Sequence, residues 1–174
     1  FGNRQNLTTF TVANGANSFW PQTLNSGVVP GTIFYRCGLT EVSIDSNVTV
    51  GISAFQENAL TSISIGENVT LSNRSFANNS ATINTLTIPG TTIFISDSTN
   101  SGTFASYSSS GGSITNLIIE EGITEIPRYC FFYSGIGSIV FPSSIIEIGD
   151  TAFYNNNISG TLTFASVIII NNTA

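Results

Sequence analysis

Apolar residues recur along this chain at fixed offsets from a series of phenylalanines. After Phe34, the offsets 5, 8, 10, 14 and 16 hold branched apolar residues, namely Leu39, Val42, Ile44, Val48 and Val50. The same offsets after Phe55 are again apolar, and those after Phe131 repeat most of the pattern. Looser copies follow Phe1, Phe76, Phe104 and Phe153. The chain therefore divides into seven repeats that begin near residues 1, 34, 55, 76, 104, 131 and 153.

Each repeat contains one alternating strand and then a second, shorter one. The first strands include 10–12, 86–88, 117–119 and 162–164, and the second strands include 48–50 and 123–126. Alternating β-branched residues bounded by Gly, Pro, Asn and Ser are typical of strands, and no segment keeps a 3.6-residue period. One coil cannot bury its own apolar face, so coils must stack at about 4.8 Å and pair their strands in parallel. The pattern predicts an all-β, β-rich solenoid of about seven repeats, forming a single domain over residues 1–174.

The amino-acid composition argues against several classes of function. Only 8% of residues are charged, against about 25% in an ordinary domain, and the net charge is −6 with 4 cationic residues. Binding to nucleic acid needs clustered Lys and Arg, so we expect no nucleic-acid partner. The absence of histidine removes His-dependent catalytic triads and most transition-metal sites, and we expect no cofactor. No apolar run approaches the roughly 20 residues of a membrane-spanning helix, so we expect no membrane insertion.

Two stretches carry a resemblance to a known family. Residues 123–131 read ITEIPRYCF and residues 139–153 read IVFPSSIIEIGDTAF. Both are similar to the BspA-like (Treponema-type) leucine-rich repeat, and the resemblance is strong over 34–75 and 123–164 and weaker over 1–33 and 76–122. It implies a curved solenoid, usually secreted or on a cell surface, that serves adhesion and protein binding without catalysis. The family's cysteine position is occupied only by Cys37. We therefore expect an extracellular structural or adhesive protein that is not an enzyme.

The two ends of the chain match the interior of the repeat. Residues 171–174 followed by Phe1 align with Gly149–Phe153, so the junction falls inside an Ala-Phe signature. Two interpretations stay open. The chain is either a fibre subunit that stacks head to tail on copies of itself, with Phe1 and Ala174 at the polymer interface, or an excerpt flanked by further repeats of a larger adhesin.

The outward positions of the first strands are mostly small hydroxyl residues. They are Thr9, Thr11, Ser43, Ser62, Ser64, Thr85, Thr87, Ser138, Thr161 and Thr163. This face either is an ordinary solvent-facing surface or binds a protein, a glycan or a neighbouring filament. Ice binding is supported less well, because Glu41 and Asn116 interrupt the array. A polysaccharide-active enzyme is supported less well too, because it needs clustered acidic or basic residues that the chain lacks.

Seven Asn-x-Ser/Thr sequons are candidate glycosylation sites in a secreted chain. They begin at Asn6, Asn47, Asn68, Asn73, Asn78, Asn157 and Asn171. Asn47 and Asn68 share a turn position between strands, and Asn73 and Asn171 share a position before the next anchor. We expect glycans to project from these turns without disturbing the stack.

Two insertions interrupt the repeat pattern. The insertion at 13–33 holds Phe19 and Trp20, which either fold back into an enlarged coil or form an exposed aromatic contact for a partner. The second insertion, 96–112, is rich in Ser and Gly, which predicts a surface loop.

Cys37 and Cys130 lie three to four coils apart, about 14–19 Å at the rung spacing. A disulfide needs Cα atoms within about 7 Å, so we expect two unpaired and partly buried thiols, with an intermolecular bridge as the alternative.

Overall fold

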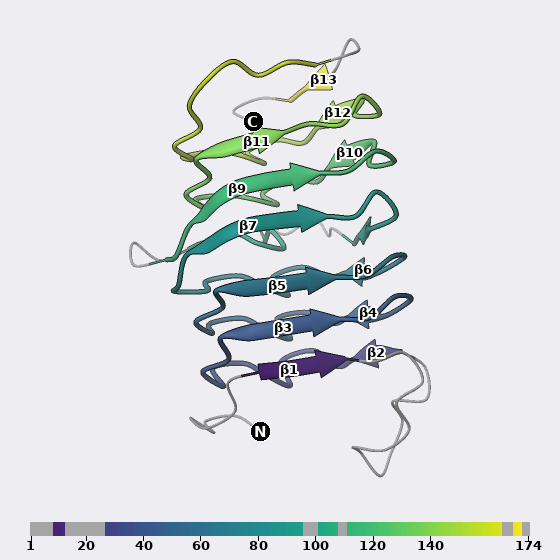
Figure 1. The fold of residues 1–174 in the computed structure, drawn as a ribbon, viewed down its shortest axis with the longest axis vertical. Helices are drawn as coiled ribbons and strands as arrows, with labels where there is room; N and C mark the ends of the chain where they lie inside the picture. The colour runs from purple at the N-terminus through teal and green to yellow at the C-terminus, as the bar shows by residue number, and fades with distance from the viewer. Residues whose placement is uncertain (1–8, 13–26, 96–100, 108–110, 165–168, 172–174) are drawn as a thin grey trace.

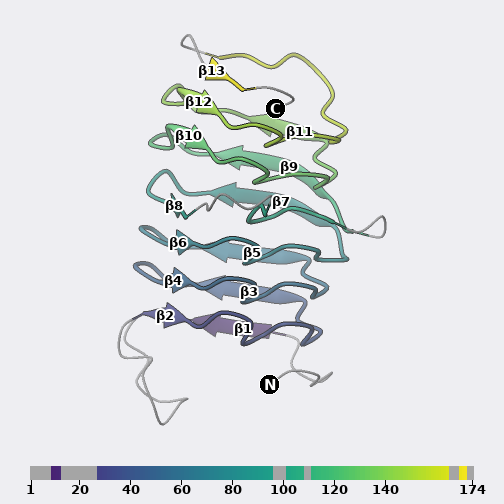
Figure 2. The same cartoon turned by 180° about the vertical axis from the view of Figure 1, so that it is seen from behind.

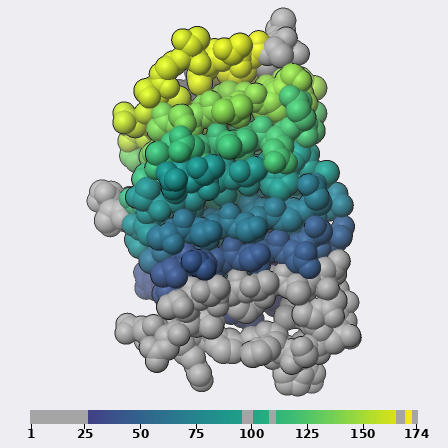
Figure 3. All heavy atoms as spheres, in the orientation of Figure 1, coloured from purple at the N-terminus to yellow at the C-terminus, as the bar shows by residue number. Residues whose placement is uncertain are grey.

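A computed structural model describes residues 9–12, 27–95, 101–107, 111–164 and 169–171 of the chain. These residues form a stack of coils built from short parallel strands, with no helix among the described residues (Figures 1 and 2). Figure 3 shows the stack of coils as successive bands of colour. The fold confirms the predicted solenoid. The strands are β1 (Thr9–Val12), β2 (Val28–Val29), β3 (Glu41–Ile44), β4 (Thr49–Val50), β5 (Ser62–Ile65), β6 (Thr70–Leu71), β7 (Ile83–Ile88), β8 (Ile93–Phe94), β9 (Ile114–Ile119), β10 (Glu125–Ile126), β11 (Ser138–Val140), β12 (Glu147–Ile148) and β13 (Ile169–Ile170).

The longer strands form a front surface and the shorter ones line the back. Sheets β1-β3-β5 and β7-β9-β11 form the front, while β2-β4-β6-β8 and β10-β12-β13 form the back (Figure 1). Every pairing is parallel. Val42 lies opposite Ile63, and Leu117 lies between Leu86 and Ile139. This register is the one that the offsets predict, because a slip of one residue would turn the apolar side chains toward solvent.

The phenylalanine anchors form a continuous ladder through the core. The rings of Phe34, Phe55, Phe76, Phe104, Phe131 and Phe153 stack with centroids 5.3–5.4 Å apart and interplanar angles of 3–11°. Phe55 and Phe131 are fully buried. Since stacked aromatic pairs gain about 0.5–1.5 kcal/mol beyond the area they bury, each pair of rings adds to the stability of the stack. Six anchors confirm their predicted positions, and Phe1 lies outside the described residues.

Each anchor lies in a turn, and this turn forms the third side of its coil beside the front strand and the back strand. The six-residue turns 31–36, 52–57, 73–78, 128–133 and 150–155 lie on the side opposite the front surface (Figure 2). Their backbones are linked from coil to coil by hydrogen bonds such as Phe34 N–H to Ala54 O, 2.9 Å, and Phe131 N–H to Ala152 O, 2.8 Å. The residues two before and two after these anchors adopt positive φ, for example Ser53 at 57° and Glu57 at 57°. We call the outer surface of the anchor-containing turns, including residues 103–107, the turn face.

An asparagine three residues after an anchor closes several coils. Asn58 is 3% exposed, and its Oδ1 accepts hydrogen bonds from the N–H groups of Cys37 and Leu39, both at 3.0 Å. Its Nδ2 donates to the carbonyl oxygens of Phe34 and Phe55, both at 2.9 Å. Asn156, in the coil of Phe153, makes similar contacts. In these coils an amide occupies the position that Cys37 holds after Phe34, and it satisfies buried backbone groups of two coils at once.

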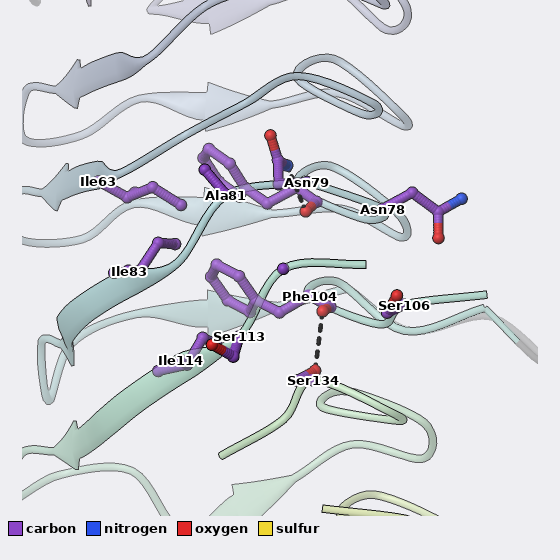
Figure 4. Close-up of a pocket in the computed structure, with 12 residues that line it drawn as sticks. Ile63, Asn78, Asn79, Ala81, Ile83, Phe104, Ser106, Ser113, Ile114 and Ser134 are labelled. Atoms are coloured by element: carbon purple, nitrogen blue, oxygen red, sulfur yellow. Dashed lines mark hydrogen bonds between the residues drawn. The ribbon is translucent and has the colours of Figure 1, made fainter. Parts of the chain in front are cut away.

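Among the described strands, the hydrogen-bonded ladder is interrupted once on the front and once on the back. No ladder joins β5 to β7 on the front or β8 to β10 on the back. Beside the front interruption lies a cavity of about 20 Å³, lined by residues that include Asn79 and Ala81 (Figure 4). Asn79 holds the position equivalent to Asn58, and its Nδ2 bonds Phe76 O at 2.7 Å, but its buried Oδ1 lacks a partner. At the place where the ladder is missing, Asn79 therefore makes half of the contacts that Asn58 makes.

Two sequence predictions about elements are wrong. Residues 162–164 form no strand, and Leu162 is 42% exposed. The alternation there matches a strand, but the residues make no ladder with β11. In the second insertion, Ser101–Ser106 are buried, whereas the prediction was a surface loop. The reason is that the ring of Phe104 stacks in the ladder, so the residues around it are packed inside the stack. The Ser and Gly content reflects small residues packed between coils, and residues 96–100 and 108–110 lie outside the description.

Candidate functional site: the turn face

The predicted hydroxyl face lies on the front surface, but in two separate groups. Ser43 pairs with Ser64 in one group, and the backbone of Thr85 pairs with that of Asn116 in the other. The interruption between β5 and β7 separates these groups. Of the predicted residues, Ser62, Ser64, Thr85, Thr161 and Thr163 are exposed, whereas Ser43, Thr87 and Ser138 are half-buried.

Neighbouring side chains further restrict this face. Ser138 Oγ donates to Asn116 Oδ1 at 2.7 Å, so its hydroxyl is already engaged. Val140, in the second outward row, is 60% exposed. Thr161 and Thr163 lie outside any strand, and the side chains of Thr9 and Thr11 are outside the described set. The hydroxyl residues therefore form no continuous array.

The sequons fall into three structural classes. Asn47, Asn68 and Asn157 are exposed, and the first two adopt positive φ in tight turns between strands. Asn78 is half-buried, and Asn171 uses its Nδ2 to bond Glu147 at 2.7 Å. Asn73 contradicts the expectation of an accessible turn side chain, because it is 5% exposed. The cause is its place at the start of an anchor-containing turn, whose backbone pairs with the coil before it.

Several predicted sites lie outside the described residues. They are the sequon at Asn6, the aromatic pair Phe19 and Trp20, and the ends Phe1 and Ala174.

The turn face gathers the exposed aromatic residues. All 5 tyrosines of the chain lie in or beside its turns. Phe132 contacts four of these rings, with centroid distances of 4.5 Å to Tyr133, 5.3 Å to Tyr129, 5.7 Å to Tyr154 and 5.8 Å to Tyr107. Tyr107, Tyr133 and Tyr154 are 39%, 41% and 46% exposed. The result is an aromatic cluster on the C-terminal half of the turn face that remains open to solvent.

Arginines frame this cluster. Arg74 lies over the ring of Tyr107 at 5.5 Å, and Arg128 lies over Tyr129 at 4.9 Å and pairs with Asp150 at 3.2 Å. Further toward the N-terminus, Arg36 covers one face of its neighbouring tyrosine ring at 5.0 Å. Guanidinium groups over ring faces fix the rings in place. The hydroxyl of Tyr35 also donates to Glu57 at 2.9 Å.

The environment keeps the phenol of Tyr107 protonated. Burial raises its pKa above 10.0, with a smaller opposing effect from the N–H of Gly102, which donates to the phenol oxygen at 2.6 Å. At neutral pH the cluster therefore presents phenol and guanidinium groups, of which the guanidinium groups can only donate. Such a surface suits partners that offer carboxylate or carbonyl oxygens.

The cysteines take no part in this surface. Cys37 and Cys130 form no disulfide, and each is 1% exposed. The prediction that these two thiols are not joined is confirmed, and they are more deeply buried than expected. Burial raises the pKa of both thiols above 9.0, which makes them poor nucleophiles and poor partners for an intermolecular bridge.

With this geometry in place, comparison with known proteins decides the family. The profile of the BspA type leucine-rich repeat region matches residues 1–105 and 103–174, with 6 copies. The chain belongs to this family. Neither a comparison with curated proteins nor one with solved structures gives a match. BspA-type repeats are typically surface-associated, and their solenoids are typically structural or adhesive rather than catalytic.

In this BspA-type chain the sequence reasoning missed the turn face, although a signal was present. Tyr35, Phe132 and Tyr154 each follow an anchor directly, so an alignment on the anchors places them in one outward row. Among the described residues there is no group of three or more Cys, Asp and Glu side chains that could hold a metal ion. Nor does that part of the chain contain a helix long and apolar enough to cross a membrane.

Proposed function

We propose that this BspA-type solenoid is a surface adhesive protein that binds its partner through the turn face. The observation that carries the proposal is the solvent-exposed cluster around Phe132, framed by Arg74 and Arg128. Tyr and Arg are the residues most enriched at the energetic centres of protein interfaces. Rings held by stacking and by guanidinium groups lose little side-chain freedom on binding, so contacts made there yield more net affinity.

The geometry favours a protein over a glycan as the partner. Tyr107, Phe132 and Tyr154 follow one another along the stack, with interplanar angles of 31° and 13°. Because neighbouring rings face one another and Arg74 covers the open side of Tyr107, few ring faces remain for a sugar to stack on. What remains outward is ring edges, phenol groups and guanidinium groups, which suit the mixed apolar and polar surface of a protein.

The test compares the two faces directly. Beads coated with the protein are applied to a panel of immobilised extracellular-matrix proteins, and the force or the fraction retained is measured. The turn-face variant is Tyr133→Ala/Tyr154→Ala, and the matched control is Ser62→Ala/Thr85→Ala on the front surface. We expect the turn-face variant to lose most of the retention, about tenfold for each hot-spot residue removed. Loss in the front variant alone would place binding on the hydroxyl face and reject the proposal.

A second candidate function, stacking into a fibre, rests on the last described strand. Among the described strands, β13 pairs with β12 alone, and its Ile169 and Ile170 are each 56% exposed. An open apolar strand edge accepts another parallel strand, and a further coil of the same repeat supplies one in register. We expect electron microscopy of concentrated protein to show rods whose axial rise follows the coil stack. Single short particles under all conditions would reject fibre formation.

A further inference from the structure

The described arginines and one group of exposed acids lie on two different sides of the solenoid. The arginines of the described residues, Arg36, Arg74 and Arg128, all belong to the turn face. A second surface is formed by the tight turns that lead from front strands to back strands (Figure 1, right-hand edge). We call it the acidic edge, and it carries Asp45, Glu67, Glu120 and Glu121. All four acids are exposed, and within the described ranges no arginine lies in these turns.

Both groups of charges run parallel to the axis of the stack. The arginines belong to the coils of Phe34, Phe76 and Phe131, which spans four rungs or about 19 Å at 4.8 Å each. The acids extend from the coil of Phe34 to that of Phe104, which spans three rungs or about 14 Å. On the turn face, Arg36 pairs with Glu57 and Arg128 pairs with Asp150. The charge that this face offers to the acids of a parallel neighbour is therefore mainly that of Arg74.

Individual groups on the two surfaces are available for contacts with such a neighbour. The guanidinium group of Arg74 lies on the ring of Tyr107, and no carboxylate of a described residue pairs with it. The carboxylate of Glu120 is exposed and forms no hydrogen bond or ion pair with another described residue. Glu121, beside it, is held in place by the N–H groups of Ser143 and Ser144 at 2.7 and 3.1 Å.

We propose that the partner of the turn face is a second copy of this chain, whose acidic edge docks on the arginines and the aromatic cluster. The inference rests on the proposed function of the turn face and names its occupant. The two contact surfaces differ, so the association is heterologous and each copy keeps one of them free for the next. Side-by-side growth of this kind produces a sheet of parallel solenoids. The ion pairs fix how far one solenoid is shifted along its neighbour, and the tyrosine rings form the part of the interface from which water is excluded.

Sedimentation velocity on the whole chain tests this directly. At about 20 mM ionic strength we expect concentration-dependent species larger than dimers, and at about 500 mM we expect monomers, because salt screens exposed charges. Arg74→Glu and Glu120→Arg should each be monomeric alone, since each substitution places two like charges where positions 74 and 120 of neighbouring copies meet. An equimolar mixture of the two variants should restore the large species. Glu41→Arg on the front surface makes the same charge change as Glu120→Arg and should associate like the wild type.

Two results would overturn the inference. One is a wild-type chain that stays monomeric at low ionic strength up to the highest soluble concentration. The other is a Glu41→Arg variant that disperses as readily as Glu120→Arg, or a variant mixture that stays monomeric. If the wild type is monomeric while the tyrosine variant still loses retention on matrix proteins, the proposed adhesive function stands and only self-association is rejected.

Discussion

Replacing Asn58 with alanine should destabilise the chain far more than the same replacement at Asn79. Asn58→Ala leaves two N–H groups and two carbonyl groups without the amide that now bonds them at 2.9–3.0 Å. The Phe55 carbonyl keeps its 3.3 Å contact with Asn79, so at about 1 kcal/mol for each of the other three groups the loss is about 3 kcal/mol. Asn79→Ala removes two donor contacts, one of them long at 3.3 Å, together with an oxygen that is already unsatisfied. Its cost should be about 1 kcal/mol.

The two variants form a matched pair, because the same side chain is removed from the same position of adjacent coils. Urea unfolding followed by circular dichroism gives the free energy of unfolding of each variant and of the wild type. The midpoint for Asn58→Ala should fall well below that for Asn79→Ala. Equal losses, or a larger loss at Asn79, would show that the asparagines are not acting through the hydrogen bonds described.

Three further predictions concern the core, the tight turns and the thiols. Phe55→Ala should cost about 3–5 kcal/mol in chemical unfolding, and Phe153→Ala clearly less, because Phe153 is half-buried and lies at the end of the ring ladder. Equal losses would argue against the ladder. Hydrogen bonds from the next coil hold the pKa of Glu121 below 4.5, so its stabilising contribution is present above pH 4.5 and disappears as the pH falls through the lowered pKa. The Tm of the wild type should therefore drop more between pH 6 and pH 3 than that of Glu121→Gln, and parallel curves would contradict this. Cys37 and Cys130 should react with a thiol reagent only after denaturation, and fast labelling of the folded chain would show that the coils open readily.

The repeat pattern predicted the parts of the fold that depend on burial. Phe34 and Phe55 stack as their spacing indicates, and Val42 faces Ile63, because only one register buries every apolar side chain. The same reasoning failed at Leu162, where an alternating pattern exists without a ladder to hold it. Alternation shows that a segment can pair, whereas pairing depends on the neighbouring coil.

The site was harder to predict than the fold. The hydroxyl face was found because period-two alternation marks which strand residues point outward. The turn face was missed because turns have no such period, and the contacts of Phe132 with Tyr107 and Tyr154 join coils that insertions have shifted in sequence. The burial of Asn73 was missed for the same reason, since a sequon marks a residue type and leaves the packing of its turn undefined.

Hydroxyl-radical footprinting of the protein while it is retained on a surface tests the central claim most directly, because it works whatever molecule on that surface is bound. All 5 tyrosines lie on the turn face, and Val140, 60% exposed, reports on the front surface. Mass spectrometry then compares the oxidation of bound and free protein at Tyr133, Tyr154 and Val140. We predict protection of both tyrosines with Val140 unchanged. Protection of Val140 with unchanged tyrosines would contradict the account and place binding on the front surface.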